Sequence, residues 1–298
     1  LRFLENLPDA APTLGKLQDL RERIASFDGL PRVPVPEIIE GTLRPYQRDG
    51  LDTLVHASSF DLGVILADDM GLGKTLQALC WLAHLRTSDP DGGPSLVVCP
   101  ASVLHNWERE VKRFAPSLSV LVLTAGEHRH ALREQIPDHD VVLTTYALMR
   151  RDVEPLSAVT WRAVVLDEAQ NIKNPDAAVS RAARALPTKH RLALTGTPLE
   201  NRALDLWSIQ AFLNPGYLGP RAAFARRFDR PDAPPHTRTL LAAKLRPVLL
   251  RRLKAQVAPE LPPRIEEQRH CELTEGQRKL YLAELARATY GFVGADIA

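Results

Sequence analysis

The feature that most constrains the fold is a regular alternation of short apolar runs with longer helical patterns. Six apolar runs, several of them rich in valine, lie at residues 63–67, 95–99, 119–123, 141–144, 163–166 and 192–194. Helical patterns lie between most of them, at residues 75–85, 102–114, 129–135 and 177–186. Short apolar runs bounded by turn residues are typical of buried strands. Their alternation with helices predicts an α/β fold, with a parallel sheet between two layers of helices.

The patterning predicts four regions. Residues 1–42 are loosely patterned and include a proline-rich stretch, so we expect a linker from an upstream domain. The α/β lobe occupies residues 43–202. No strand pattern follows Pro198, and residues 203–256 are expected to form a helical protrusion. The chain does not begin with methionine and stops in a helical pattern, so residues 257–298 are expected to connect to a further lobe of a longer protein.

Composition narrows the class of protein. A net charge of +2 over 298 residues gives no general attraction for nucleic acid, and no apolar run approaches the ~20 residues that span a membrane. Cys80, Cys99 and Cys271 lack the spacing of a metal site or a disulfide framework, which predicts buried thiols in a reducing compartment. Arginine outnumbers lysine and alanine and proline are abundant, which indicates a GC-rich bacterial genome and a cytoplasmic protein.

A glycine-rich segment follows the first apolar run and opens the next helical pattern. It runs from Asp68 to Thr75 and contains Gly71 and Gly73. Glycines allow successive backbone N–H groups to face phosphate oxygens, and a helix N-terminus adds its positive end. Lys74 is predicted to bind the β- and γ-phosphates of ATP, and Thr75 to bind Mg²⁺. The alternative is a chance Gly-Lys-Thr at a helix start, since Asp68 stands where the general pattern has glycine.

Two acidic residues end the fifth apolar run. Asp167 and Glu168 follow residues 164–166, and acids at the end of a buried strand are costly unless a cation lies nearby. Asp167 is predicted to hold Mg²⁺, and Glu168 to act as the general base toward water. Solvated acids at a strand end are the alternative. Together with the glycine-rich segment, the pair predicts hydrolysis of a nucleoside triphosphate.

Two further segments are less specific. Gln47 lies about one helix upstream of the glycine-rich segment, and its amide matches the adenine edge, although a glutamine at such a position is usually solvated. Thr195, Gly196 and Thr197 follow the sixth apolar run, where the two threonine hydroxyl groups could reach the acidic pair or a neighbouring lobe. A tight turn is the alternative.

Nucleic-acid binding has two candidate regions. Ser102 and Thr145 lie where apolar runs lead into helices, a placement that suits phosphate contacts. From spacing alone, helix capping by these two residues is the simpler interpretation. Residues 218–254 carry ten basic and two acidic residues, a segment charge of +8 that could attract a phosphate backbone or form a solvated helical face.

In content and order, these motifs resemble the Swi/Snf-type ATPases of helicase superfamily 2. The resemblance covers about residues 41–282 and is carried by residues 43–47, 67–75, 98–107, 144–146, 167–174, 194–201 and 249–254. An aspartate at position 68 is usual in that family. Gln170, where many members have histidine, indicates a prokaryotic branch.

The resemblance implies a RecA-like P-loop NTPase lobe that acts with a second RecA-like lobe on double-stranded DNA, in the bacterial nucleoid. It implies nucleotide binding by Arg44, Gln47, Met70, Gly71, Leu72, Gly73, Lys74, Thr75 and Gln170. It implies catalysis by Lys74, Asp167 and Glu168, with Mg²⁺ held by Thr75 and Asp167. It implies DNA contacts by Ser102, Asn106 and Thr145, and coupling between nucleotide state and lobe closure by Thr195, Gly196 and Thr197.

The later motifs of the family are not found in these 298 residues. They include arginines that reach the γ-phosphate from the second lobe, so this chain is expected to bind ATP but hydrolyse it poorly. Other interpretations are a superfamily 2 motor on RNA or RNA polymerase, a restriction-system motor, and a nucleotide-gated binding module. The pair Asp167 and Glu168 argues against the last, because a switch alone needs no general base.

Overall fold

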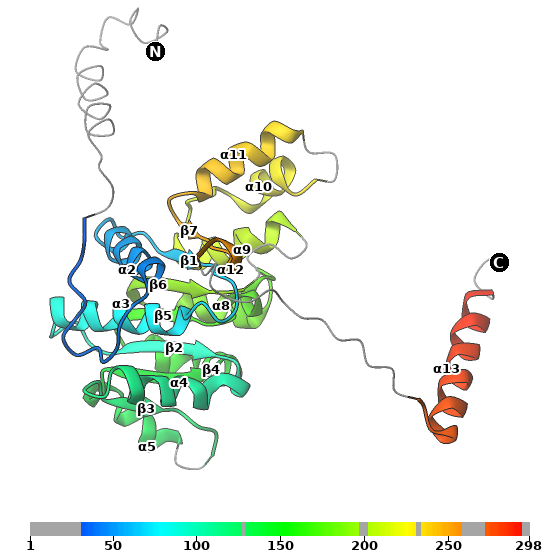
Figure 1. Cartoon of the computed structure of the whole chain (residues 1–298), viewed down its shortest axis with the longest axis horizontal. Helices are drawn as coiled ribbons and strands as arrows, with labels where there is room; N and C mark the ends of the chain where they lie inside the picture. Colours follow the sequence, from blue (N-terminus) through cyan, green and yellow to red (C-terminus); the bar gives the residue numbers. More distant parts are fainter. Residues whose placement is uncertain (1–30, 127–128, 197–201, 231–233, 258–271, 294–298) are drawn as a thin grey trace, which may run out of the picture. The chain divides into compact units, whose positions relative to one another are not determined.

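The structure is a computed structural model in which two compact units are separated near residue 258. It describes residues 31–126, 129–196, 202–230, 234–257 and 272–293 (Figure 1). Most of the predicted linker at residues 1–42 lies outside these ranges, as do Thr197 and Cys271. Within the second unit, the described structure is helix α13 (Glu275–Val293). No helix in the described ranges combines the length and the apolar character that crossing a membrane requires.

The core of the first unit is a seven-stranded sheet in which every neighbouring pair is parallel. Figure 1 shows the strand order β3-β4-β2-β5-β6-β1-β7. The strands are β1 (Val64–Leu66), β2 (Ser95–Cys99), β3 (Val120–Val122), β4 (Val141–Thr145), β5 (Trp161–Leu166), β6 (Thr188–Leu194) and β7 (Leu249–Leu250). Each of the six predicted apolar runs contains a strand or the end of one, which confirms the predicted α/β class.

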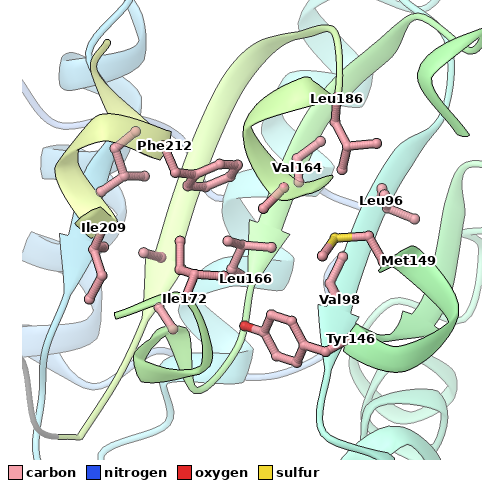
Figure 2. Packing of buried hydrophobic residues seen from close by; sticks show 14 of the residues in the cluster. Leu96, Val98, Tyr146, Met149, Val164, Leu166, Ile172, Leu186, Ile209 and Phe212 are labelled. Carbon is pink, nitrogen blue, oxygen red and sulfur yellow. The ribbon is translucent and has the colours of Figure 1, made fainter. Parts of the chain in front are cut away.

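Helices cover both faces of the sheet because successive strand residues face opposite sides. One face packs against α2 (Pro45–Ser58), α3 (Lys74–Ser88) and α4 (Ala101–Phe114). The other packs against α6 (Tyr146–Arg151), α7 (Val153–Ser157), α8 (Ala178–Ala185) and α9 (Ala203–Leu213). Figure 2 shows this second cluster, where Val98 and Leu166 from the strands meet Met149 and Phe212 from the helices.

The remaining described elements are short or peripheral. They are α5 (Arg129–Glu134), the 3₁₀ turns η1 (Ile136–Asp138) and η2 (Ala169–Ile172), α10 (Arg221–Phe228), α11 (Pro235–Leu245) and α12 (Lys254–Val257). Helix α9 ends just before Asn214, Pro215 and Gly216, and α11 begins at Pro235. Cys80 and Cys99 are free and buried, and burial raises the pKa of each thiol to about 12, as expected of structural thiols.

The prediction that strands end before Pro198 is wrong. Strand β7 extends the sheet beyond β1, with Leu249 opposite Ile65 and Leu250 opposite Leu66. The strand has two residues, too few for a recognisable apolar run. Backbone hydrogen bonds from Ile65 to Val248 and from Ala67 to Leu250 hold it, and they place the residues after it beside the glycine-rich segment.

The two ends of the expected protrusion therefore belong to the lobe itself. Helix α9 buries Leu206, Ile209 and Phe212 in the core of the lobe, and β7 lies in its sheet. The Asn214 amide fixes the end of α9 by accepting from the Gly63 N–H at 2.9 Å and donating to the Gly63 carbonyl at 2.8 Å. We accordingly propose that only α10 and α11 project from the lobe.

Asn214→Ala should lower the free energy of unfolding by about 2–3 kcal/mol, because it leaves both backbone groups of Gly63 buried without their partner. Asn174→Ala is the matched control, since Asn174 is exposed and accepts one hydrogen bond from the Asp176 N–H. Urea unfolding of the 298-residue chain measures both. Equal effects of the two substitutions would contradict this role of Asn214.

Candidate functional site

Three of the predicted motifs meet at the carboxyl end of the sheet. Strand β6 lies between β5 and β1, with Leu194 opposite Leu66 and Ala193 opposite Leu166. The residues that follow these strands therefore emerge side by side. Ligands of open parallel sheets bind beyond this edge.

The glycine-rich segment has the backbone of a phosphate-binding loop. Gly71 and Gly73 have φ angles of +83° and +74°, and Gly73 immediately precedes α3. The positive φ of Gly73 favours glycine there, and a Cβ atom on Gly73 would lie 2.4 Å from Nε2 of Gln47, which would have to move. The Lys74 ammonium donates to the Asp68 carbonyl at 2.7 Å, at the mouth of the loop.

Gln47 is part of the loop's support. It is 7% exposed, its Nε2 donates to the Leu72 carbonyl at 3.1 Å, and its Oε1 accepts from the Arg44 N–H at 2.9 Å. Burial of Gln47 therefore rules out the alternative of a merely solvated glutamine at this position. Leu72 is buried, whereas Met70 is 65% exposed. The sequence-predicted nucleotide-binding residues of α2 and of the loop thus lie in contact.

Charge at the site is concentrated around Lys74. Burial lowers the pKa of the Lys74 ammonium, and attraction from Glu168, Asp68 and Asp167 opposes that shift. Burial raises the pKa of the Asp167 carboxyl, and a hydrogen bond from Trp107 opposes it. The loop and the acidic pair thus share one electrostatic environment, although 93 residues separate Lys74 from Asp167.

A chain of side-chain hydrogen bonds joins the acidic pair to the end of β6. Nε2 of Gln170 donates to Glu168 at 2.7 Å, and Oε1 of Gln170 accepts from the Thr195 hydroxyl at 2.9 Å. Glu168 has a φ angle of +49°, which is uncommon for a residue other than glycine and is typical of functional sites. The structure thus brings Gln170 and Thr195 into contact, with Gly196 next along the chain.

Thr75 and Asp167 suit Mg²⁺ chemically. Thr75 is the second residue of α3 and is half-buried. Asp167 directly follows β5, and each of its carboxylate oxygens accepts one protein hydrogen bond. Hydroxyl and carboxylate oxygens are the hard ligands that Mg²⁺ prefers, and the ion usually takes one or two of them together with phosphate oxygens and water. Both residues retain acceptor capacity for that role.

A buried ion pair locks the start of the phosphate loop. Asp68 is 0% exposed, and the Arg252 guanidinium binds both of its carboxylate oxygens, with Nε at 2.9 Å from Oδ1. The same guanidinium donates to Oε1 of Gln77 at 2.6 Å and to the Tyr46 carbonyl. Asp68 is therefore fully satisfied, which explains why a carboxylate is tolerated where the general loop pattern has glycine.

The predicted nucleic-acid residues lie on two neighbouring segments. Thr145 caps α6 by accepting from the Leu148 N–H, as capping predicted. Ser102 is exposed and does not cap α4, because that helix begins at Ala101 after Pro100 without a side-chain cap, so capping by Ser102 was wrong. Asn106 is half-buried and hydrogen-bonds within α4 to Glu110 and Arg109.

Two arginines of the basic stretch at residues 218–254 form ion pairs with carboxylates of the same unit. Arg221 binds both carboxylate oxygens of Asp176 at 2.6 and 2.8 Å, and Arg252 binds Asp68. The Arg252 pair is buried, whereas the Arg221 pair is exposed to solvent and contributes little to the stability of the lobe.

Comparison with known proteins decides the family. A family model described as an SNF2-related domain matches residues 46–295. The chain belongs to this family. The Bacillus subtilis protein YwqA, named as an ATP-dependent helicase/translocase, is 42% identical over 283 residues, which cover 92% of this chain and 30% of YwqA. TATA-binding protein-associated factor MOT1 of Saccharomyces cerevisiae is 38% identical over 274 residues, which cover 83% of this chain and 15% of MOT1.

Solved structures agree. The SWI2/SNF2 ATPase core of Sulfolobus solfataricus, in complex with dsDNA, matches with a TM-score of 0.71 and 40% identity, over 90% of this chain and 56% of that chain. A second structure, of the SWI2/SNF2 ATPase core domain of Sulfolobus solfataricus, matches with a TM-score of 0.71 and 40% identity over 87% of this chain and 54% of that chain. These matches confirm the SNF2-type family and the RecA-like lobe predicted from sequence, and this chain spans just over half of those solved cores.

Sequence reasoning missed three side chains of this SNF2-related site. They are Arg252, which binds Asp68, and Trp107 and Tyr146, which donate to Asp167 at 2.8 and 2.7 Å. A buried acid at a strand end signals that a cationic partner exists, but nothing in the sequence says which of the many arginines supplies it. Trp107 and Tyr146 directly follow Asn106 and Thr145, and no local pattern marks either aromatic residue as a partner of Asp167.

Arg252→Ala should lower the free energy of unfolding by about 3–5 kcal/mol, because it leaves Asp68 buried without its partner. The stability of Arg252→Lys should lie between those of the unmodified protein and Arg252→Ala, because an ammonium group cannot bind both carboxylate oxygens as the guanidinium does. Arg251→Ala is the matched control, as Arg251 is the exposed neighbour. Urea unfolding of the 298-residue chain would contradict the account if the Arg251 and Arg252 variants unfolded alike.

Proposed function

We propose that this chain is the ATP-binding lobe of a DNA-dependent ATPase that translocates on double-stranded DNA. The observation that carries the proposal is the meeting of Lys74, Asp167 and Glu168 beyond one edge of the sheet of an SNF2-related domain. A phosphate loop beside paired carboxylates suits hydrolysis of a nucleoside triphosphate, and a binding switch alone has no use for the second carboxylate.

In this proposal the loop and the start of α2 hold ATP. Backbone N–H groups of residues 71–75 and the Lys74 ammonium bind the β- and γ-phosphates, and Gln47 faces the adenine edge with Arg44. Met70 and Leu72 line the loop around the nucleotide. To bind the phosphates, the Lys74 ammonium must give up its hydrogen bond to the Asp68 carbonyl, which requires rotation of one flexible side chain.

The acidic pair supplies the chemistry. Thr75 and Asp167 hold Mg²⁺, which when bound neutralises charge on the phosphates. Glu168 orients the attacking water and accepts its proton. Gln170 restrains the Glu168 carboxylate through the 2.7 Å hydrogen bond, and Thr195 restrains Gln170 in turn, so that residues 195–197 can relay lobe movement to the general base.

Duplex DNA and a second lobe complete the proposal. The Sulfolobus relative was solved with dsDNA, and Ser102, Asn106 and Thr145 lie on segments placed for backbone contacts. The relatives extend beyond this chain, and we propose that a second RecA-like lobe there supplies arginines to the γ-phosphate. Because such arginines contribute ~10³-fold or more, we expect these 298 residues alone to bind ATP and hydrolyse it slowly. A bacterial motor of this kind would act in the cytoplasm, on the nucleoid.

Lys74→Ala should reduce duplex-stimulated ATP hydrolysis by the full-length protein by roughly 10²-fold to 10³-fold, since it removes a donor to the charge that develops on the phosphates. Lys189→Ala is the matched control, an exposed lysine near the opposite end of the sheet that pairs with Asp89. Phosphate release with and without duplex DNA measures both variants.

The same assay separates the other interpretations. Stimulation by RNA or by single strands, and not by duplex DNA, would replace the translocase with another superfamily 2 motor. ATP binding without turnover by the full-length protein, whatever the nucleic acid, would leave the nucleotide-gated binding module.

A further inference from the structure

Two aromatic side chains from separate segments donate hydrogen bonds to one residue, Asp167. The Trp107 indole N–H donates to Oδ2 of the Asp167 carboxylate at 2.8 Å. The Tyr146 hydroxyl donates to the Asp167 carbonyl at 2.7 Å. Asp167 is thus held at its side chain and at its backbone by groups that the hydrolysis chemistry does not itself require.

Trp107 is a rigid attachment between α4 and the carboxylate. Its side chain is 1% exposed, and Trp107 and Val111 are the two buried residues of α4. A close-packed indole has little room to rotate, so a displacement of α4 along or across the sheet carries the N–H with it. The Asp167 carboxylate must then move with the indole N–H, or the hydrogen bond to Oδ2 breaks.

Tyr146 makes the equivalent attachment from the next segment. It is the first residue of α6, directly after the Thr145 cap, and its ring packs in the cluster with Val98 and Leu166. Figure 2 shows the ring beside Val98, with its hydroxyl directed away from Met149. The hydroxyl therefore reaches across the cluster to the end of β5 and fixes the turn that presents the Asp167 carboxylate.

The placement of these donors connects them to the proposed DNA contacts. Trp107 follows Asn106 in sequence, and Tyr146 follows Thr145. Two of the three predicted DNA-contacting residues, Asn106 and Thr145, are therefore one peptide bond from a side chain that holds the proposed Mg²⁺ ligand. Strands β2 and β4, which lead into α4 and α6, are also paired directly, with Cys99 opposite Thr145.

We propose that Trp107 and Tyr146 are positioning residues that couple duplex DNA to ATP hydrolysis by setting the orientation of Asp167. The part of this inference that concerns DNA rests on the proposed function. Phosphate contacts at α4 and at the start of α6 would move the two donors, and Asp167 would present its free lone pairs to Mg²⁺ in the orientation that hydrolysis needs. Neither aromatic side chain touches nucleotide or DNA in this role.

Conservative variants remove each donor and keep an aromatic side chain. Trp107→Phe replaces the indole with a smaller phenyl ring that has no N–H, and Tyr146→Phe deletes the hydroxyl alone. Trp161→Phe is the matched control for Trp107→Phe. Trp161 is also buried, at the start of β5, the strand that Asp167 follows. Its indole N–H donates to the Leu156 carbonyl at 2.8 Å. Tyr217→Phe is the control for Tyr146→Phe, since its hydroxyl donates to the Lys244 carbonyl at 2.7 Å.

Two measurements on the full-length protein test the proposal. The first is the Mg²⁺ concentration for half-maximal binding of a fluorescent ADP analogue without DNA, and the second is the factor by which duplex DNA stimulates ATP hydrolysis. Trp107→Phe should raise the Mg²⁺ midpoint and lower the DNA stimulation, each by roughly 10-fold to 100-fold, the usual effect of losing a partner of a metal ligand. Tyr146→Phe should lower the stimulation about fivefold, as expected for one neutral hydrogen bond.

The controls make the outcomes decisive. Affinity for duplex DNA should stay within about threefold of the unmodified protein in all four variants, because none of the side chains contacts phosphate. If Trp107→Phe and Trp161→Phe had the same Mg²⁺ midpoint and the same stimulation, the proposal would be overturned. If the unmodified protein showed no stimulation, the proposed function and the DNA coupling would both fail, while the Mg²⁺ midpoint would still decide whether Trp107 positions Asp167.

Discussion

The ion pair between Asp68 and Arg252 holds together segments that are 184 residues apart in the sequence. A carboxylate taken out of water at the end of a strand costs several kcal/mol unless its oxygens are bound. The Arg252 fork and the Gln77 amide bind both oxygens, and the Arg252 guanidinium also lies 5.4 Å from the centre of the Tyr46 ring. The loop, α2, α3 and β7 are therefore fixed to one another through a single charged cluster.

That arrangement explains the path of the chain after the helical projection. The backbone returns to the sheet as β7, forms the Arg252 contacts, and then continues at Lys254, whose N–H donates to the Asp69 carboxylate at 3.0 Å. The Lys254 ammonium lies 3.3 Å from the point that a Cβ atom would occupy if Gly71 had one. The segment that follows β7 thus contacts the phosphate loop directly.

The sequence was informative where local patterns decide structure. Apolar runs located six strands, and Gly71, Gly73 and Lys74 predicted the loop, because strand burial and left-handed glycine conformations depend on nearby residues. β7 was missed because two residues make no pattern. The bonds of Gln47, Arg252 and Trp107 depend on tertiary contacts across 25, 184 and 60 residues, which no local spacing encodes. The motif residues were therefore predictable, and the side chains that hold them in place were not.

Displacement of a third strand from triplex DNA tests the central claim most directly, because it reports movement along a duplex. We predict that the full-length protein displaces the third strand when ATP is hydrolysed, leaves the underlying duplex paired, and loses this activity in Lys74→Ala. Vigorous duplex-stimulated hydrolysis that displaces no third strand would contradict the account, since energy would then be released at this site without translocation.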